Sequence, residues 1–182
     1  SSAHGRISHV RRRPPVQDGT SISTYYVLQR GVASHPFGVC WSAWRRSVVG
    51  NTAGLGQPDH CWLLPKTELR LPADETRKQM QAVMGCHHAG LPGAVRWFED
   101  ERYFYVIAPE QGKALAYRVM ELEVVEETWV AGVAAQALDA LSFLHSQRQP
   151  HGGVSLFTIH VDAGGYVCLS PPLAGFLCAA GP

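Results

Sequence analysis

A long helical pattern near the carboxyl end is followed at once by two short apolar strands, and this order restricts the possible folds strongly. Apolar residues recur every three or four positions from residue 127 to 147, which predicts an amphipathic helix with one buried face. Pro150 closes the helix, because proline has no amide hydrogen to donate. Residues 157–161 and 165–169 have the composition of strands joined by a turn. The apolar positions of the helix are Val130, Val133, Ala134, Ala137, Leu138, Leu141 and Leu144.

The amino-terminal part has the pattern of a sheet with one helix. The helix is expected at residues 73–84, with Asp74 as N-cap, Glu75 in its first turn and Gly85 at its end. A second, short helix is expected at residues 114–120. The chain is therefore predicted to be α+β, either one ordinary domain or a small two-lobed one. Strands are expected at residues 24–29, 39–44, 61–64, 94–98 and 103–108.

The charge balance and the cysteines limit the partners and the compartment. The net charge of +1 favours neither nucleic acid nor an anionic membrane surface. No apolar run is long enough to span a bilayer. The five cysteines are odd in number and widely spaced, so we expect free thiols in a reducing compartment. A cytoplasmic location follows, with a mitochondrial one as the alternative.

The first residues form a basic segment. Residues 1–17 are rich in Ser and Arg and contain no carboxylate. Such a composition is typical of a disordered basic arm, and it also resembles the tail of an organelle transit peptide. We assign residues 1–22 to this arm.

Two groups of cysteine and histidine invite comparison with zinc sites. These are His60-Cys61 and the run from Cys86 to His88. Neither has the C-x-x-C or H-x-x-x-H spacing that brings several ligands to one ion. The sequence therefore predicts no metal site.

The segment HGGVSLFTIHVD at residues 151–162, between FLHSQ and GYVCLSPP, resembles the catalytic segment of the protein kinases. The family pattern is H-R-D-L-x-x-x-N-I-L-L-D followed by G-x-V-x-L-x-D-F-G. The resemblance extends loosely over residues 24–176 and is close over 138–170. It implies a kinase-like α+β fold, with a small β-rich lobe containing one helix at residues 23–110. A hinge and a partial helical carboxy-terminal lobe at residues 111–182 would follow.

The same resemblance implies that the catalytic chemistry is lost. Gly153 stands at the position of the catalytic Asp, Thr158 at that of the metal-binding Asn, and Pro171 at that of the D-F-G Asp. A general base needs a carboxylate or imidazole, and Mg²⁺ needs oxygen ligands. The resemblance therefore implies a pseudokinase that is not an enzyme and holds no cofactor or metal.

Lys66 is the counterpart of the phosphate-pairing lysine of the family, which makes it the candidate cofactor-binding residue. The alternative is a solvated lysine at the end of a strand. Its family partner, a Glu, should fall near Gln81, where this chain has no carboxylate. The glycine-rich loop corresponds to residues 31–43, with Pro36 removing one of the amide donors.

These observations lead to one predicted function and two alternatives. We expect a catalytically inactive kinase-like domain that serves protein–protein interaction or scaffolding in a larger assembly. Protein partners would cover the apolar end at residues 173–182. A narrower resemblance supports scaffolding, because residues 152–169 are similar to the kinase-like segment ahead of BEACH domains in WD40 scaffold proteins. The alternatives are an α+β subunit of a large complex, in an organelle or elsewhere, and an atypical active kinase that uses Lys66 with Asp59 or the acids at 99–101.

Overall fold

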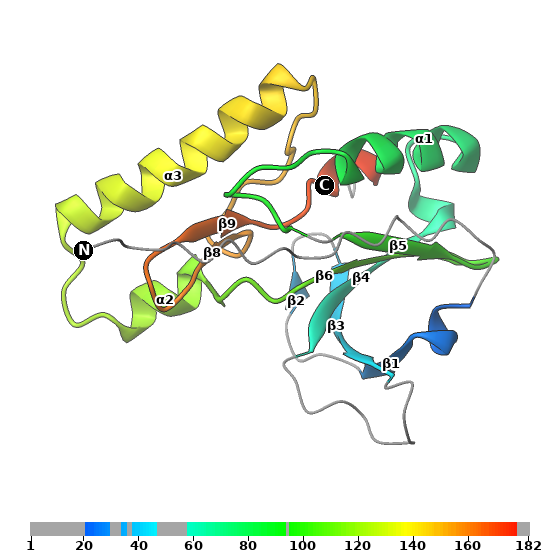
Figure 1. Cartoon of the computed structure of the whole chain (residues 1–182), viewed down its shortest axis with the longest axis horizontal. Coiled ribbons are helices and arrows are strands. Elements are labelled where there is room, and N and C mark those ends of the chain that lie inside the picture. The colour runs from blue at the N-terminus through cyan, green and yellow to red at the C-terminus, as the bar shows by residue number, and fades with distance from the viewer. Residues whose placement is uncertain (1–20, 30–33, 36–37, 47–57, 94, 178–182) are drawn as a thin grey trace, which may run out of the picture.

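Two antiparallel sheets and three α-helices form the part of the chain that the computed structural model describes, namely residues 21–29, 34–35, 38–46, 58–93 and 95–177 (Figure 1). The α+β class predicted from the sequence is therefore confirmed. The larger sheet has the strand order β1-β3-β4-β6-β5, with the short β2 paired to β3, and the smaller sheet has the order β7-β8-β9. The strands are β1 (Tyr26–Gln29), β2 (Ser34–His35), β3 (Gly38–Arg45), β4 (Asp59–Pro65), β5 (Arg96–Glu99), β6 (Tyr103–Ala108), β7 (Lys113–Ala114), β8 (Ile159–Val161) and β9 (Val167–Leu169).

The helices connect and cover these sheets. Among the described residues, no helix is both long and apolar enough to cross a membrane. The α-helices are α1 (Ala73–Met84), α2 (Leu115–Glu121) and α3 (Glu127–Ser146), and the short 3₁₀ helices are η1 (Ile22–Thr24), η2 (Lys66–Glu68) and η3 (Ala174–Phe176).

Strand β4 lies at the centre of the larger sheet and is buried on both faces. Cys61 pairs with Ile107 of β6, and both lie in the apolar cluster on the outer face with Phe98. Trp62 and Leu64 point to the opposite face, which α1 covers. A sheet covered on both faces lets apolar residues follow one another without alternation, which explains the run CWLL in β4.

Helix α1 has the predicted bounds but not the predicted cap. Its N-cap is Pro72, which makes no side-chain hydrogen bond, so the assignment of Asp74 as cap is wrong. Asp74 and Glu75 instead lie in the first turn, where carboxylates favour the positive end of the helix dipole. Gly85 is the C-cap, as expected.

Helix α3 packs on the smaller sheet, and its buried face differs from the predicted one. Ala140 joins the inward stripe, whereas Val130 is 46% exposed and Leu138 is 64% exposed. Ala134 is also exposed, so three of the seven predicted positions face away from the sheet. The helix is apolar around much of its circumference, and periodicity alone therefore did not fix which side packs. The buried residues are Val133, Ala137, Ala140 and Leu144.

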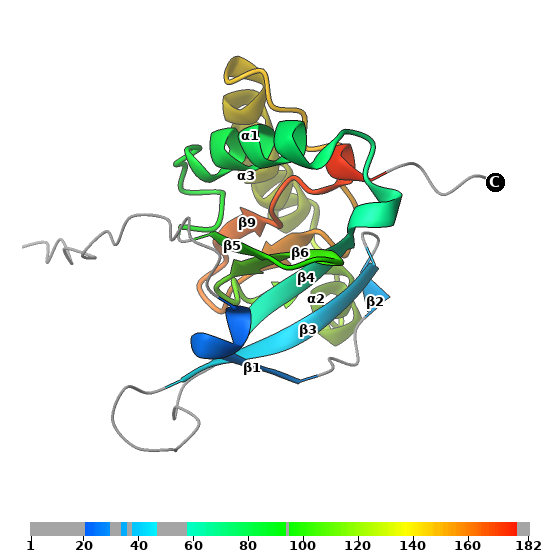
Figure 2. The ribbon, with the colours of Figure 1, turned by 90° about the vertical axis from the view of Figure 1, so that its right-hand side faces the viewer.

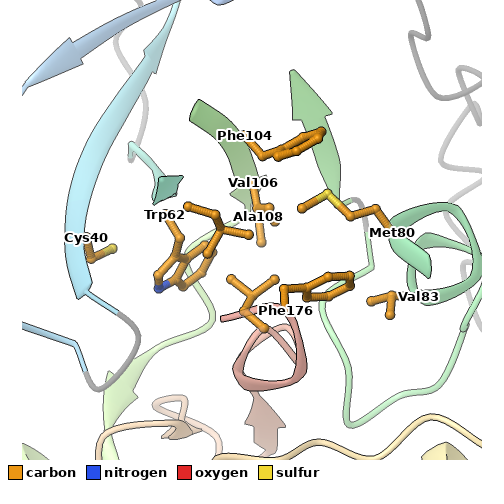
Figure 3. Close-up of a cluster of buried hydrophobic side chains, with 10 residues drawn as sticks. Cys40, Trp62, Met80, Val83, Phe104, Val106, Ala108 and Phe176 are labelled. Atoms are coloured by element: carbon orange, nitrogen blue, oxygen red, sulfur yellow. The ribbon is translucent and has the colours of Figure 1, made fainter. Parts of the chain in front are cut away.

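The carboxy-terminal segment returns to the larger sheet. Figure 2 shows α1 and η3 on the same side of that sheet. Leu173 and Phe176 are buried in the cluster that also contains Met80 of α1 (Figure 3). The backbone is held there as well, since Arg70 N donates a hydrogen bond to Phe176 O at 3.0 Å. The chain itself thus covers Leu173 and Phe176. That protein partners cover the apolar end stays a prediction, and residues 178–182 lie outside the described part.

A short connection with Gly112 joins the two sheets. The larger sheet ends at Ala108 and the smaller one begins at Lys113. Gly112 has φ of +96°, and a Cβ there would come within 2.6 Å of the Val161 carbonyl oxygen. Only glycine accommodates both constraints, so the connection crosses β8 at close approach. The division into lobes at residues 23–110 and 111–182 remains a prediction, and residues 1–20 of the proposed arm lie outside the described ranges.

Candidate functional site

A pocket of about 430 Å³ opens where the two sheets meet. The larger sheet contributes His60 of β4, and the smaller one contributes His160 of β8. The connection between the sheets closes one side, and α2 together with the loop before β8 closes another. The aromatic rings of Tyr117 and Phe157 meet edge to face at this mouth, with centroids 6.1 Å apart. The lining residues are Cys40, His60, Glu110, Gly112, Lys113, Ala114, Tyr117, Glu121, Phe157 and His160.

The two histidines face each other across the pocket. Their ring centroids are 6.1 Å apart. Burial, and next the repulsion from His60, lower the pKa of His160 to about 4. Burial also lowers the pKa of His60. Both imidazoles are therefore neutral at pH 7 and offer hydrogen bonds instead of positive charge.

His160 is only 7% exposed, and its two ring nitrogens differ. Nε2 lies 3.0 Å from Ser170 Oγ. Nδ1 is buried. A hydrogen bond with the Gly112 backbone partly offsets the fall in the pKa of His160.

The loop that the kinase resemblance singled out is held by its own hydroxyl and backbone groups. Thr158 is fully buried, and its Oγ1 accepts from Ser155 N at 2.8 Å. The same hydroxyl donates to the carbonyl oxygen of Gly153, also at 2.8 Å. Thr158 Oγ1 is thus engaged in shaping the loop, and Gly153 contributes its carbonyl to that network.

We expect Thr158→Val to lower the free energy of unfolding by about 1–3 kcal/mol, because Ser155 N and Gly153 O would lose their partner at little change in volume. Urea unfolding followed by circular dichroism measures this. Thr158→Ser keeps the hydroxyl and is the matched control. Equal losses in the two variants would show that the methyl group, not the hydroxyl, stabilises the loop.

The segment at the D-F-G position is buried and has no side-chain oxygen to offer a cation at Pro171. Ser170 N donates to Thr158 O at 2.7 Å, and His151 Nε2 lies 3.0 Å from Ser170 O. His151 is buried, and burial lowers its pKa. The ring therefore joins the loop to the strand end as a structural group.

The inward positions of β4 and α1 are apolar. Trp62 and Leu64 of β4 and Met80 of α1 belong to one buried cluster (Figure 3). Gln81, the position predicted for the family Glu, is exposed, so Met80 takes the inward place one residue earlier. The space that an ion pair between strand and helix would occupy is filled by apolar side chains in this chain.

Lys66 lies at the start of η2 and does not line the pocket. Its Nζ is 2.6 Å from Glu99 Oε1 and 5.2 Å from the centre of the Phe104 ring. Arg77 of α1 binds the same carboxylate at 2.6 Å. Hydrogen bonds from Arg77, and next from Lys66, hold the pKa of Glu99 below its usual value against the opposing effect of burial. Lys66 as a nucleotide ligand stays a prediction, but its ammonium group is already paired.

The other acid proposed for an atypical kinase is also engaged. Asp59 is buried and accepts hydrogen bonds from Arg45 at 2.9 and 3.3 Å. Within the described ranges, no three His, Cys, Asp or Glu side chains converge as a metal site. Much of the glycine-rich segment, including Pro36, lies outside the described residues.

Comparison with known proteins gives a partial similarity. A segment of 65 residues is 37% identical to the human serine/threonine-protein kinase VRK3. The match covers 35% of this chain and 14% of VRK3, so the chain spans only a small part of that relative's length. No protein-family model matches the chain. The chain is thus similar to a kinase over about a third of its length.

The sequence did not predict this pocket, and it brought up His60 only as a zinc ligand that was rejected. His60 and His160 each lie in a short strand pattern, where alternation could have placed them on the face of Trp62 and of Thr158. The two histidines lie in different sheets, and their proximity depends on how these sheets are placed in the fold. No local sequence pattern predicts that placement. Tyr117 and Phe157 are likewise joined only by the tertiary fold.

Proposed function

We propose that this chain is a kinase-like domain that has lost phosphotransfer and serves as a protein–protein interaction module. The strand order β1-β3-β4-β6-β5 with α1 between β4 and β5 supports the kinase-like part, as does the connection to α3 and the β8–β9 hairpin. A five-stranded path of this kind with one covering helix is the arrangement that the resemblance implies. The partial similarity to VRK3 agrees with it.

One observation carries the loss of activity. Three residues stand where the resemblance expects the groups that hold a metal-bound triphosphate. Gly153 has no side chain, Pro171 has no side-chain oxygen, and the hydroxyl of Thr158 is already hydrogen-bonded within its own loop. Phosphoryl transfer depends on positioning and on neutralising charge with cations and oxygen ligands. On the facing side, Trp62 of β4 and Met80 of α1 form part of a buried apolar cluster where charge is needed. A site of this composition does not stabilise a polyphosphate.

The test is a titration with Mg-ATP. We expect no rise in melting temperature at millimolar Mg-ATP and no transfer of phosphate to a general acceptor protein. A ligand present at 100 times its Kd would stabilise the fold by about 2.7 kcal/mol, which is easily seen in a melting curve. An active protein kinase in the same assays is the positive control. Saturable stabilisation together with phosphotransfer, lost on Lys66→Ala, would favour the atypical-kinase alternative instead.

A further inference from the structure

The segment between α1 and β5 reaches α3 and β9 and so joins the two parts of the fold (Figure 1). Leu169 N of β9 donates a hydrogen bond to Gly90 O at 2.9 Å. Gly90 also lies against α3, where a Cβ on this glycine would come within 2.8 Å of the Ala140 Cβ. The next residue, Leu91, is buried in the cluster that α3 forms with the smaller sheet. The turn at Gly90 is therefore a point where the chain after α1 is held to α3 and β9.

The side chain of His88 shapes this turn. Its Nδ1 accepts a hydrogen bond from Gly90 N at 3.1 Å. A ring nitrogen that accepts carries no hydrogen, so the neutral imidazole has its hydrogen on Nε2. Nε2 lies 3.2 Å from Oδ2 of Asp139 on α3 and can donate to it. The ring also stacks on Phe143, with ring centroids 5.0 Å apart. We call His88, Gly90 and Asp139 the latch.

A proton added to His88 does not fit this arrangement. The imidazolium carries a hydrogen on each ring nitrogen, so Nδ1 can no longer accept from Gly90 N. Gly90 is buried, and its amide would be left without a partner. The protonated ring is attracted to Asp139, but that side chain is 75% exposed, and ion pairs in water are weak. A buried amide without a partner costs more than such a pair contributes, so the turn opens.

The other titratable groups around the ring do not replace Asp139. Burial raises the pKa of both nearby cysteine thiols, so they are uncharged at pH 7. The two further groups on α3 lie in its first and last turns, each more than one helical turn from Asp139. The remaining titratable side chains on α3, on β9 and in the segment itself are Glu127, His145, Cys168, Cys86 and His87.

We infer that the latch is a pH-sensitive device, which holds the segment after α1 to α3 and β9 while His88 is neutral and releases the turn at Gly90 when His88 is protonated. The release moves Gly90 away from α3 and weakens its bond to Leu169. The rest of the fold stays in place, because the sheets and helices have their own buried clusters. The latch does not depend on the proposed interaction function.

Nuclear magnetic resonance of the natural chain tests the latch. At about pH 7.5 the nitrogen signals of the His88 ring should show a bare Nδ1 and a protonated Nε2. As His88 becomes protonated toward about pH 5.5, the hydrogen-exchange protection of the Gly90 amide should fall at least about fivefold. The Leu169 amide should follow it. Amides of β6 report global unfolding, and the fall at Gly90 should exceed theirs. A hydrogen on Nδ1 at pH 7.5, or protection at Gly90 that does not follow the titration of His88, would overturn the inference.

His88→Asn separates the proton from the shape of the turn. The asparagine oxygen can accept from the amide two residues on, as Nδ1 does, but it does not titrate. The protection of the Gly90 amide relative to β6 should then stay constant between about pH 7.5 and 5.5. His145→Asn is the matched control, because it removes an exposed histidine of α3 and should behave like the natural chain. Equal pH dependence in the two variants would reject the latch.

Asp139→Asn tests the other side of the ring. It keeps an oxygen that accepts from Nε2 but removes the charge, so the protonated ring loses the attraction of the carboxylate. The midpoint of the fall in Gly90 protection should therefore move to lower pH. An unchanged midpoint would show that Asp139 takes no part, and the latch as described would be wrong.

Discussion

Replacing Phe176 with alanine is expected to lower the free energy of unfolding by about 3–5 kcal/mol. Phe176 is buried in the cluster between the larger sheet and α1, together with Trp62 and Val83. Removing its ring leaves a cavity that these neighbours can close only in part. The segment after β9 would also lose the side chain that fixes it to the larger sheet. Urea unfolding at pH 7 measures the loss.

Phe157→Ala is the matched control for this prediction. It removes the same ring from a side chain that is 43% exposed, so we expect a loss of about 1 kcal/mol or less. Hydrogen exchange adds a local readout, because α1 should exchange faster in Phe176→Ala and unchanged in the control. Similar losses in the two variants would mean that the carboxy-terminal segment contributes little to the larger sheet.

The position of Phe176 also shows why the sequence predicted some parts of this fold and not others. Helix α1 and the β5–β6 hairpin could be predicted from local sequence patterns, because the contacts that define them join residues close together in the chain. Phe176 and Val83 are far apart in the chain but belong to one buried cluster, and no periodicity predicts this. For that reason the sequence did not indicate that the larger sheet and α1 cover Leu173 and Phe176.

In the candidate site, too, the sequence predicted some features and missed others. The sequence alone was enough to compare Gly153, Thr158 and Pro171 with the catalytic positions of the resemblance, because a motif fixes which residue types matter. The position of the Lys66 side chain could not be predicted from the sequence. A strand that continued past Pro65 would have kept Lys66 on the face of Trp62 and Leu64 by alternation. The chain instead turns into η2 there, and the ammonium group meets Glu99.

Acidification from pH 6.5 to 5 is expected to lower the free energy of unfolding by about 1.5 kcal/mol through His160 alone. Its pKa in the folded chain is about 4, against an ordinary value near 6.5. Between these values the unfolded chain binds a proton that the folded chain does not bind. Stability is therefore complete above about pH 6.5 and is lost as the pH falls toward 4, at about 1.4 kcal/mol per pH unit.

The histidines and the carboxylates contribute to the pH dependence of the unfolding free energy in different pH ranges. The pKa of His60 and that of His151 are also lowered by burial, so these residues add to the slope in the same direction. Glu99 has a lowered pKa through Arg77 and Lys66, and its contribution is lost only at lower pH, below about 4.5. His160→Gln removes one titrating group and keeps a polar side chain near Ser170. Its curve of unfolding free energy against pH should be shallower between pH 6.5 and 5 by about the slope of one proton. Parallel curves for the variant and the natural chain would show that His160 is protonated as readily in the folded chain as in the unfolded one, and the neutral pocket would then be wrong.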